Sequence, residues 1–145
     1  MDFKKEAIYK LQCYNAKRES IANTEAEIKR LESELGRIRS ATTDATPVSG
    51  GTNQREDMLI NNIALRIELK AAQTDTVEWL RIVDEALRSL SDSERRILDL
   101  MYMNRAKGNV DRLCEELHIE KPTVYRWRDS ALRHFTIALY GITET

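Results

Sequence analysis

Cysteine and histidine residues in the last third of the chain are the first candidates for chemistry, because both side chains can ligate a metal. Cys114 and His118 stand four residues apart, a spacing that places two side chains on one face of a helix. His134 could supply a third ligand. A structural zinc site needs four ligands at recognisable spacings, and no nearby cluster completes the set. The sequence therefore predicts no metal site and no cofactor.

Catalysis would require a general base with an orienting partner, or an activated nucleophile. The chain has only two histidines and no glycine-rich phosphate loop. Its acidic residues fall at positions expected on solvated helix faces. We therefore expect a protein without enzymatic activity.

Basic residues between positions 121 and 133 are stronger candidates, because they could contact phosphates and base edges. If Val124 points to the core, the 3.6-residue period turns Arg126 and Arg133 to the opposite side. Arg128 falls nearer the core edge, where its stem could pack. Tyr125 and Arg126 are the preferred base readers, and the predicted DNA-contacting residues are Lys121, Thr123, Tyr125, Arg126, Asp129 and Arg133. The alternative is a solvated basic face without a ligand.

Two short helices joined by a tight turn would position this basic face. Leu113 and Leu117 lie four apart on one helical face, and Ile119 can fill the gap beneath the turn. Pro122 suits the first turn of the second helix, 121–135, because no intrahelical acceptor waits for its missing N–H. The predicted motif core is Leu113, Cys114, Leu117, Ile119, Val124 and Trp127. This spacing is typical of a helix-turn-helix, whose second helix lies in the DNA major groove.

A further helix precedes this pair and begins with a capping box. Ser91 can accept from the backbone N–H of Glu94 while the Glu94 side chain reaches back. The segment 104–109, which contains Gly108, is expected to end this helix. Three aromatic residues fall on apolar stripes, which predicts core positions rather than platforms for stacking on single-stranded bases: Trp79, Trp127 and Phe135.

The segment from Leu90 to Tyr102, followed by this motif, resembles the fourth region of bacterial sigma factors. The sequence Thr46-Pro47-Val48-Ser49-Gly50-Gly51, between two long predicted helices, resembles the RinA and ArpU families of phage late-transcription regulators. The resemblance implies a double-stranded DNA-binding activator of phage late genes, with RNA polymerase as a further candidate partner. In these families positions 114 and 118 usually hold alanine and glycine. His118 is a departure, because histidine adopts positive φ only at a cost that glycine avoids.

The first ninety residues predict two long helices with a polar connection. Residues 3–40 contain no proline, and Ile28, Leu31, Leu35 and Ile38 form an a/d seam. Residues 41–54 are rich in threonine, serine and glycine, which favours a loop. Helical spacing resumes over 55–89, and it leaves open whether the helix breaks near 73–76.

These elements predict an all-α protein with two parts. Residues 1–90 form a helical hairpin, or coiled coil, for oligomerisation or partner binding, and residues 91–145 form the three-helix DNA-binding domain. We expect a homo-oligomer, with a dimer favoured, because helix-turn-helix proteins commonly pair over two half-sites. The alternative is a monomer whose hairpin satisfies itself. The rival functions are a ring-forming small terminase-like packaging subunit and a coiled-coil adaptor that binds protein.

Composition places further bounds on the partner and the location. The net charge is −1, so any nucleic-acid contact must come from basic residues arranged on one face. Cys13 and Cys114 are distant in sequence, which favours reduced thiols. No apolar run approaches the about 18 residues of a membrane span. We expect no membrane partner and a location in the cytoplasm of a bacterial host.

Overall fold

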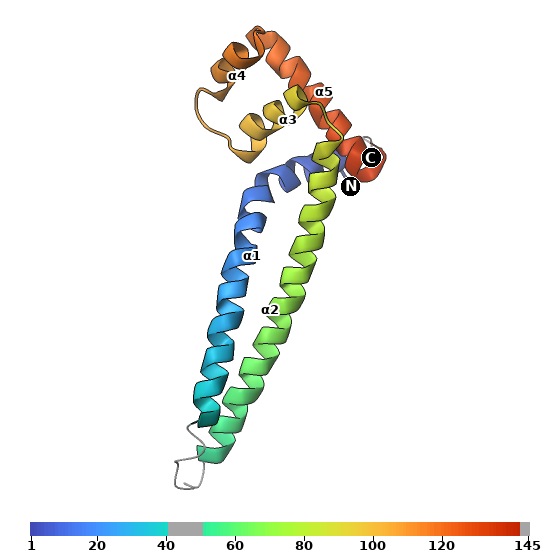
Figure 1. Ribbon diagram of the computed structural model, residues 1–145. Coiled ribbons are helices and arrows are strands. Elements are labelled where there is room, and N and C mark those ends of the chain that lie inside the picture. The colour runs from blue at the N-terminus through green and yellow to red at the C-terminus, as the bar shows by residue number, and fades with distance from the viewer. Residues whose placement is uncertain (41–50, 143–145) are drawn as a thin grey trace. The chain divides into compact units, whose positions relative to one another are not determined.

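The computed structural model describes residues 1–40 and 51–142, and every regular element in those residues is helical (Figure 1). This confirms the predicted all-α class. Two 38-residue helices are followed by four shorter elements, and the order is α1 (Phe3–Ser40), α2 (Gly51–Arg88), α3 (Asp92–Leu98), the π-helix η1 (Asp99–Met103), α4 (Asn109–Leu117) and α5 (Lys121–Tyr140).

The chain forms two compact units whose boundaries differ from the predicted division after residue 90. One unit joins residues 1–17 to the chain from Glu78 onward, and the other is residues 18–77. Both long helices therefore contribute to both units. The predicted boundary followed a change of motif, whereas the compact units follow burial: Ala7 and Leu11 at the start of α1 and Leu90 just beyond α2 are buried in the first unit.

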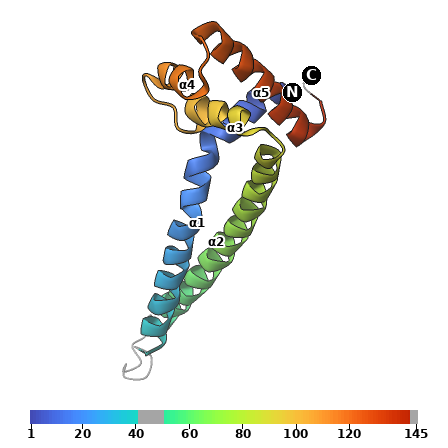
Figure 2. The same ribbon diagram turned by 45° about the horizontal axis from the view of Figure 1, so that its top comes forward.

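Within residues 18–77, α1 and α2 lie side by side and run antiparallel (Figures 1 and 2). The amide of Asn62 donates to the Leu31 carbonyl over 2.8 Å, and the amide of Gln73 donates to the Ile21 carbonyl over 3.3 Å. The predicted seam residues Leu31 and Leu35 are buried within the single chain. Helix α2 of the same chain therefore packs along this seam, and the expected homo-oligomer stays a prediction.

The question of a break near residues 73–76 is resolved, because α2 is continuous through them. The hydroxyls of Thr74 and Thr76 donate to the carbonyls of Lys70 and Ala72, so each polar side chain is satisfied by the preceding turn. The predicted loop 41–54 was too long at its end, since Gly51 begins α2. Residues 41–50, with most of the segment on which the phage-family resemblance rests, lie outside the described residues.

The first unit is built on a core shared by α3, η1, α4 and α5. Its centre consists of Ile97, Leu100, Leu113 and Val124. Phe135 is also fully buried, as predicted. The start of α1 packs against the end of α5, where the rings of Phe3 and Tyr140 lie 5.1 Å apart. This packing brings residues from both ends of the chain into one unit.

The helix ends follow local capping rules. Ser91 and Glu94 form the predicted capping box, with both reciprocal hydrogen bonds present. The helical path continues from α3 into η1, a wide π turn that the spacing did not predict. Helix α5 extends five residues beyond the predicted end at Phe135, and it stops at Gly141, whose φ of 78° suits glycine.

Candidate nucleic-acid interface

The turn between α4 and α5 is closed by backbone hydrogen bonds to a single carbonyl. The N–H groups of His118 and Ile119 both donate to the Cys114 carbonyl, the latter over 3.2 Å. Such bonds are typical of a helix end with one left-handed residue. His118 is that residue, with φ 55° and ψ 46°. Ile119 packs against the core beneath the turn.

Most of the predicted motif core lies where the spacing placed it, but Trp127 does not. Leu113 and Val124 are fully buried, and Cys114, Leu117 and Ile119 pack against them. Trp127 is 41% exposed, so its predicted core position was wrong. The buried side of α5 continues from Val124 through Leu132 and Phe135, and Trp127 lies at the edge of that side. Trp79 is half-buried, with the Lys17 ammonium 5.5 Å from its ring.

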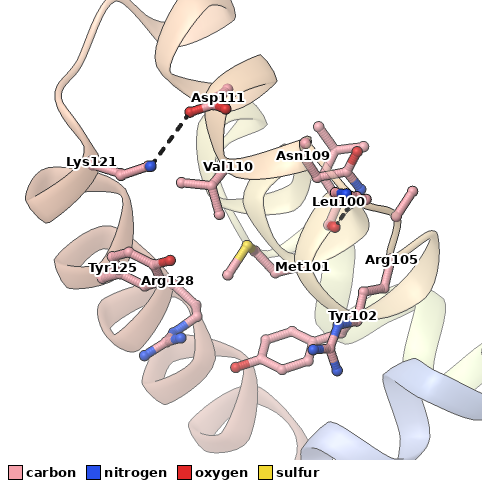
Figure 3. A pocket seen from close by; sticks show the side chains of 13 residues that line it. Leu100, Met101, Tyr102, Arg105, Asn109, Val110, Asp111, Lys121, Tyr125 and Arg128 are labelled. Carbon is pink, nitrogen blue, oxygen red and sulfur yellow. Dashed lines mark hydrogen bonds and ion pairs between the residues drawn. The ribbon is translucent and has the colours of Figure 1, made fainter.

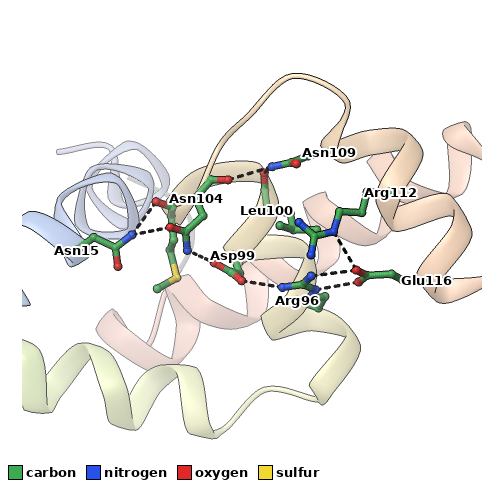
Figure 4. A network of polar contacts seen from close by, with 9 residues as sticks. Asn15, Arg96, Asp99, Leu100, Asn104, Asn109, Arg112 and Glu116 are labelled. Atoms are coloured by element: carbon green, nitrogen blue, oxygen red, sulfur yellow. Dashed lines mark hydrogen bonds and ion pairs between the residues drawn. The ribbon is translucent and has the colours of Figure 1, made fainter.

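A polar network fixes α4 against α3 (Figure 4). The Arg96 guanidinium donates two hydrogen bonds to the Glu116 carboxylate, over 2.8 and 2.9 Å, and a third to Asp99 over 3.1 Å. Arg112 adds a bond of 3.1 Å to Glu116. The hydrogen bonds from Arg96, followed by its charge and the contacts of Arg112, lower the pKa of Glu116 from the ordinary 4.5 to about 2.

The loop between η1 and α4 is tied down by asparagine side chains. The buried Asn109 amide donates to the carbonyls of Leu100 and Asn104, over 2.7 and 2.9 Å. Asn15 on α1 donates to the Met103 carbonyl and to the Asn104 side chain (Figure 4). The backbone of this loop is therefore held from both α1 and α4, which gives the adjoining side chains a defined place.

This loop forms one wall of a groove of about 810 Å³, and the first turns of α4 and α5 complete it (Figure 3). Four basic residues and one acidic residue line the groove, which gives the lining a net charge of +3. The charged residues are Arg105, Lys107, Asp111, Lys121 and Arg128. Tyr102 and Tyr125 also line it.

Contacts within the groove arrange some of these charges. The Lys121 ammonium lies 3.7 Å from the Asp111 carboxylate (Figure 3). The Arg128 guanidinium lies 5.1 Å from the centre of the Tyr125 ring and donates to Asp129. Arg128 thus braces Tyr125 rather than only packing by its stem. Two of the basic residues lining the groove, Lys121 and Arg128 on α5, therefore form ion pairs, with Asp111 and Asp129 respectively.

A second hollow, of about 420 Å³, lies along the outer side of α5. It is lined by Lys4, Arg126, Asp129, Ser130, Arg133 and Thr136. Arg126 donates to the Thr123 hydroxyl over 3.1 Å, which orients its guanidinium along the first turns of α5. Arg126 and Arg133 are exposed. This hollow therefore combines two basic residues of α5 with one from the start of α1.

The predicted contact residues consequently divide into two neighbouring sets. Lys121 and Tyr125 face the groove, while Arg126, Asp129 and Arg133 line the outer hollow, and Thr123 is bonded to Arg126. Sequence reasoning missed three basic residues that line these surfaces, Lys4, Arg105 and Lys107, and it placed a fourth, Arg128, at the core edge rather than among the contact residues. The closeness of Arg105 and Lys107 to the motif was a usable signal, whereas nothing local pointed to Lys4.

Comparison with known proteins identifies one family. The family described as "Protein of unknown function (DUF1492)" matches residues 37–136. The chain belongs to the DUF1492 family. No curated protein and no solved structure matches this DUF1492 chain. The matched residues include the groove and nearly all of α5, whereas Lys4 and Asn15 lie outside the match.

The three residues considered as metal ligands have separate surroundings in this DUF1492 protein. Cys114 is half-buried against the core, and His118 is exposed at the end of α4. The Nδ1 atom of His134 lies 2.5 Å from the Glu94 carboxylate. Burial opposes ionisation of Glu94, but bonds from His134 and from the Ser91 backbone outweigh burial and lower its pKa. Among the described helices, none is long and apolar enough to cross a membrane.

Proposed function

We propose that this member of the DUF1492 family is a double-stranded DNA-binding regulator of transcription. In this proposal α4 and α5 form a helix-turn-helix, α5 is the recognition helix in the major groove, and α1 with α2 forms a hairpin arm. One observation carries it: basic side chains gather on both sides of the N-terminal half of α5, in a chain whose net charge is −1. Basic charge gathered around one helix, in a chain with almost no net charge, is the electrostatic footprint expected of a nucleic-acid-binding protein.

The two surfaces suit different parts of a duplex. Arg126 lies in the second turn of α5, where recognition helices reach base edges, and its exposed guanidinium can bond guanine in a bidentate way. Arg133 lies further along the same side and suits phosphate. The groove, with Arg105 and Lys107 on its loop wall, suits a neighbouring stretch of the backbone, because lysine and arginine neutralise phosphates without reading sequence.

The finer proposal is an activator of phage late genes, and it rests on the resemblance to RinA, ArpU and sigma region 4. The segment from Leu90 to Tyr102, which resembles sigma region 4, contains α3 and most of η1. We therefore take the exposed surface of α3 and η1 as the candidate contact for RNA polymerase. A terminase-like packaging role remains the rival function. The activator and the packaging subunit would bind different sites on the genome that encodes the protein: a promoter region and a packaging site.

Footprinting of the purified chain on the genome that encodes it tests the proposal directly. We expect a protected duplex site beside a promoter, with affinity that falls as salt rises. Protection at a packaging site would favour the rival function. Absence of binding to any duplex fragment at low salt would overturn the assignment of α5 to the major groove.

A further inference from the structure

Three isoleucines of α2 face solvent in the unit formed by residues 18–77. Ile60, Ile63 and Ile67 are 63%, 38% and 64% exposed. Their spacing of three and four residues places them on one face of the helix. The side of α2 that packs on α1 carries different residues: Asn62 and Gln73, which donate to carbonyl groups of α1, and the half-buried Leu59 and Leu69 at the same helical phase. The isoleucine stripe therefore points away from α1.

Helix α2 therefore carries a second apolar surface in addition to the side that packs on α1. A contiguous apolar stripe on a water-exposed helix marks an interaction site more often than a random surface. Within residues 18–40, α1 contributes none of the exposed large hydrophobic side chains. The unpartnered apolar surface of this unit is thus concentrated on α2.

We propose that a second copy of this chain covers the stripe, with the two α2 helices antiparallel. The charges at the ends of the stripe select this partner. Glu56 lies one turn before Ile60, and Lys70 lies about one turn after Ile67, all on the same face. In an antiparallel pair with Ile60 opposite Ile67 of the other copy, each Glu56 meets a Lys70 of the other copy. A parallel pair would set Glu56 against Glu56 and Lys70 against Lys70.

The contact is two-fold symmetric, so each favourable pair occurs twice. Ala64 and Ala71 are exposed along one edge of the stripe, and their small side chains allow the helices to approach closely. Lys70 also lies 3.9 Å from Glu32 of its own chain, with both side chains exposed. An exposed pair at this distance contributes little, so Lys70 can exchange partners. The inference goes beyond DNA binding and rests on residues 18–77 alone.

The solution mass of the full chain is the first test. We expect twice the 16.8 kDa of one chain. Ile63→Lys should give the mass of a single chain with unchanged helix content, because this side chain is not needed for packing against α1. Leu65→Lys is the matched control, since Leu65 is 41% exposed on the same helix but lies off the stripe. That variant should remain dimeric.

Charge exchange tests the antiparallel register. Glu56→Lys or Lys70→Glu alone should raise the dimer dissociation constant by roughly tenfold, because each change creates two like-charge contacts. The double variant should restore the wild-type value. Within one chain the two positions are fourteen residues apart, about 21 Å along the helix, so restoration requires contact between copies.

Three results would overturn the proposal: a wild-type protein with the mass of one chain at every concentration, a closed assembly larger than a dimer, or equal disruption by Leu65→Lys and Ile63→Lys. Failure of the double variant to restore association would reject the antiparallel register. DNA affinity of Ile63→Lys is measured separately, so loss of the dimer and loss of DNA binding are distinguishable.

Discussion

His118 shows how one residue can carry strain at the turn between α4 and α5. Its φ of 55° is the only positive φ of a non-glycine residue within the described range, and the left-handed region is disfavoured for residues with a Cβ atom. The backbone bonds from His118 and Ile119 to the Cys114 carbonyl hold this conformation. The turn geometry that a glycine would adopt freely is thus imposed on a histidine.

Replacing His118 with glycine should therefore stabilise the protein, by about 0.5–1 kcal/mol, because relief of the left-handed strain exceeds the extra freedom of the unfolded chain. Urea unfolding followed by circular dichroism measures this. Glu115→Gly, one turn earlier and exposed within α4, is the matched control and should lower stability by about 1 kcal/mol. A destabilised His118→Gly variant would show that the histidine side chain itself holds the turn.

Arg126 and Arg133 should differ in what they contribute to DNA binding. Arg126→Ala is expected to weaken binding to the cognate site by about 1–3 kcal/mol and to relax preference at one base pair. Arg133→Ala should weaken binding to all sequences and reduce the salt dependence by about one counterion. Titrations on cognate and unrelated duplexes at two salt concentrations separate these effects.

Lys29→Ala serves as the control for both arginine variants, because Lys29 is an exposed basic residue of the unit formed by residues 18–77, whereas the α5 surfaces belong to the other unit. It should bind as the wild type does. If all three variants behave alike, the basic face of α5 is only a solvated surface.

At the scale of elements, the Arg96–Glu116 pair links α3 to α4 and so helps to position the helix that precedes α5, the proposed recognition helix. The pKa of Glu116 is lowered to about 2, which means that the folded state favours the ionised carboxylate. Its contribution to stability is therefore fully present above the ordinary value of about 4.5. That contribution is lost as the pH falls from about 4.5 to about 2.

Glu116→Gln should accordingly lower the melting temperature at pH 7 and have little effect near pH 2. Thermal unfolding of the two proteins across this range measures the difference. Glu115→Gln is the control, because the ion pairs of Arg96 within the described residues are with Asp99 and Glu116. A difference that persists unchanged at pH 2 would assign the effect of Glu116 to packing rather than to its charge.

For the whole molecule, two compact units share the two long helices, so a defect in one unit need not abolish the other. Leu31 is buried in the unit of residues 18–77. Leu31→Asp places a charge in that core and should destabilise this unit by about 2–4 kcal/mol, through lost burial and an unpaired buried carboxylate.

The expected result for Leu31→Asp is a loss of helix content that is confined to residues 18–77, measured by hydrogen exchange, with DNA affinity of the other unit retained per chain. Ser33→Asp introduces the same charge at an exposed neighbouring position and should leave both units folded. Simultaneous loss of protection throughout the chain would show that the two units unfold as one.

Local chemistry in the sequence was sufficient to predict most helix boundaries. Three features depend only on groups within about four residues of one another: the Ser91 and Glu94 capping box, the start of α5 beside Pro122, and the left-handed position at His118. They can therefore be predicted without knowledge of the fold. The same holds for Leu113 and Val124, whose spacing already indicates a common buried side. The end of α5 at Gly141 was a local signal that the prediction did not use.

Only the tertiary structure decided which side of each helix is covered. Trp127 is exposed although it stands three residues from the buried Val124, because the packing of α3 and α4 on α5 decides which part of the helix is covered, and no local rule fixes that choice. The isoleucines of α2 face solvent because the side of α2 that carries Asn62 and Gln73 packs on α1, a choice that the apolar spacing alone did not make. Lys4 joins Arg126 and Arg133 through packing between the two ends of the chain. Helical periodicity specifies a face, but burial of that face depends on elements that are distant in sequence.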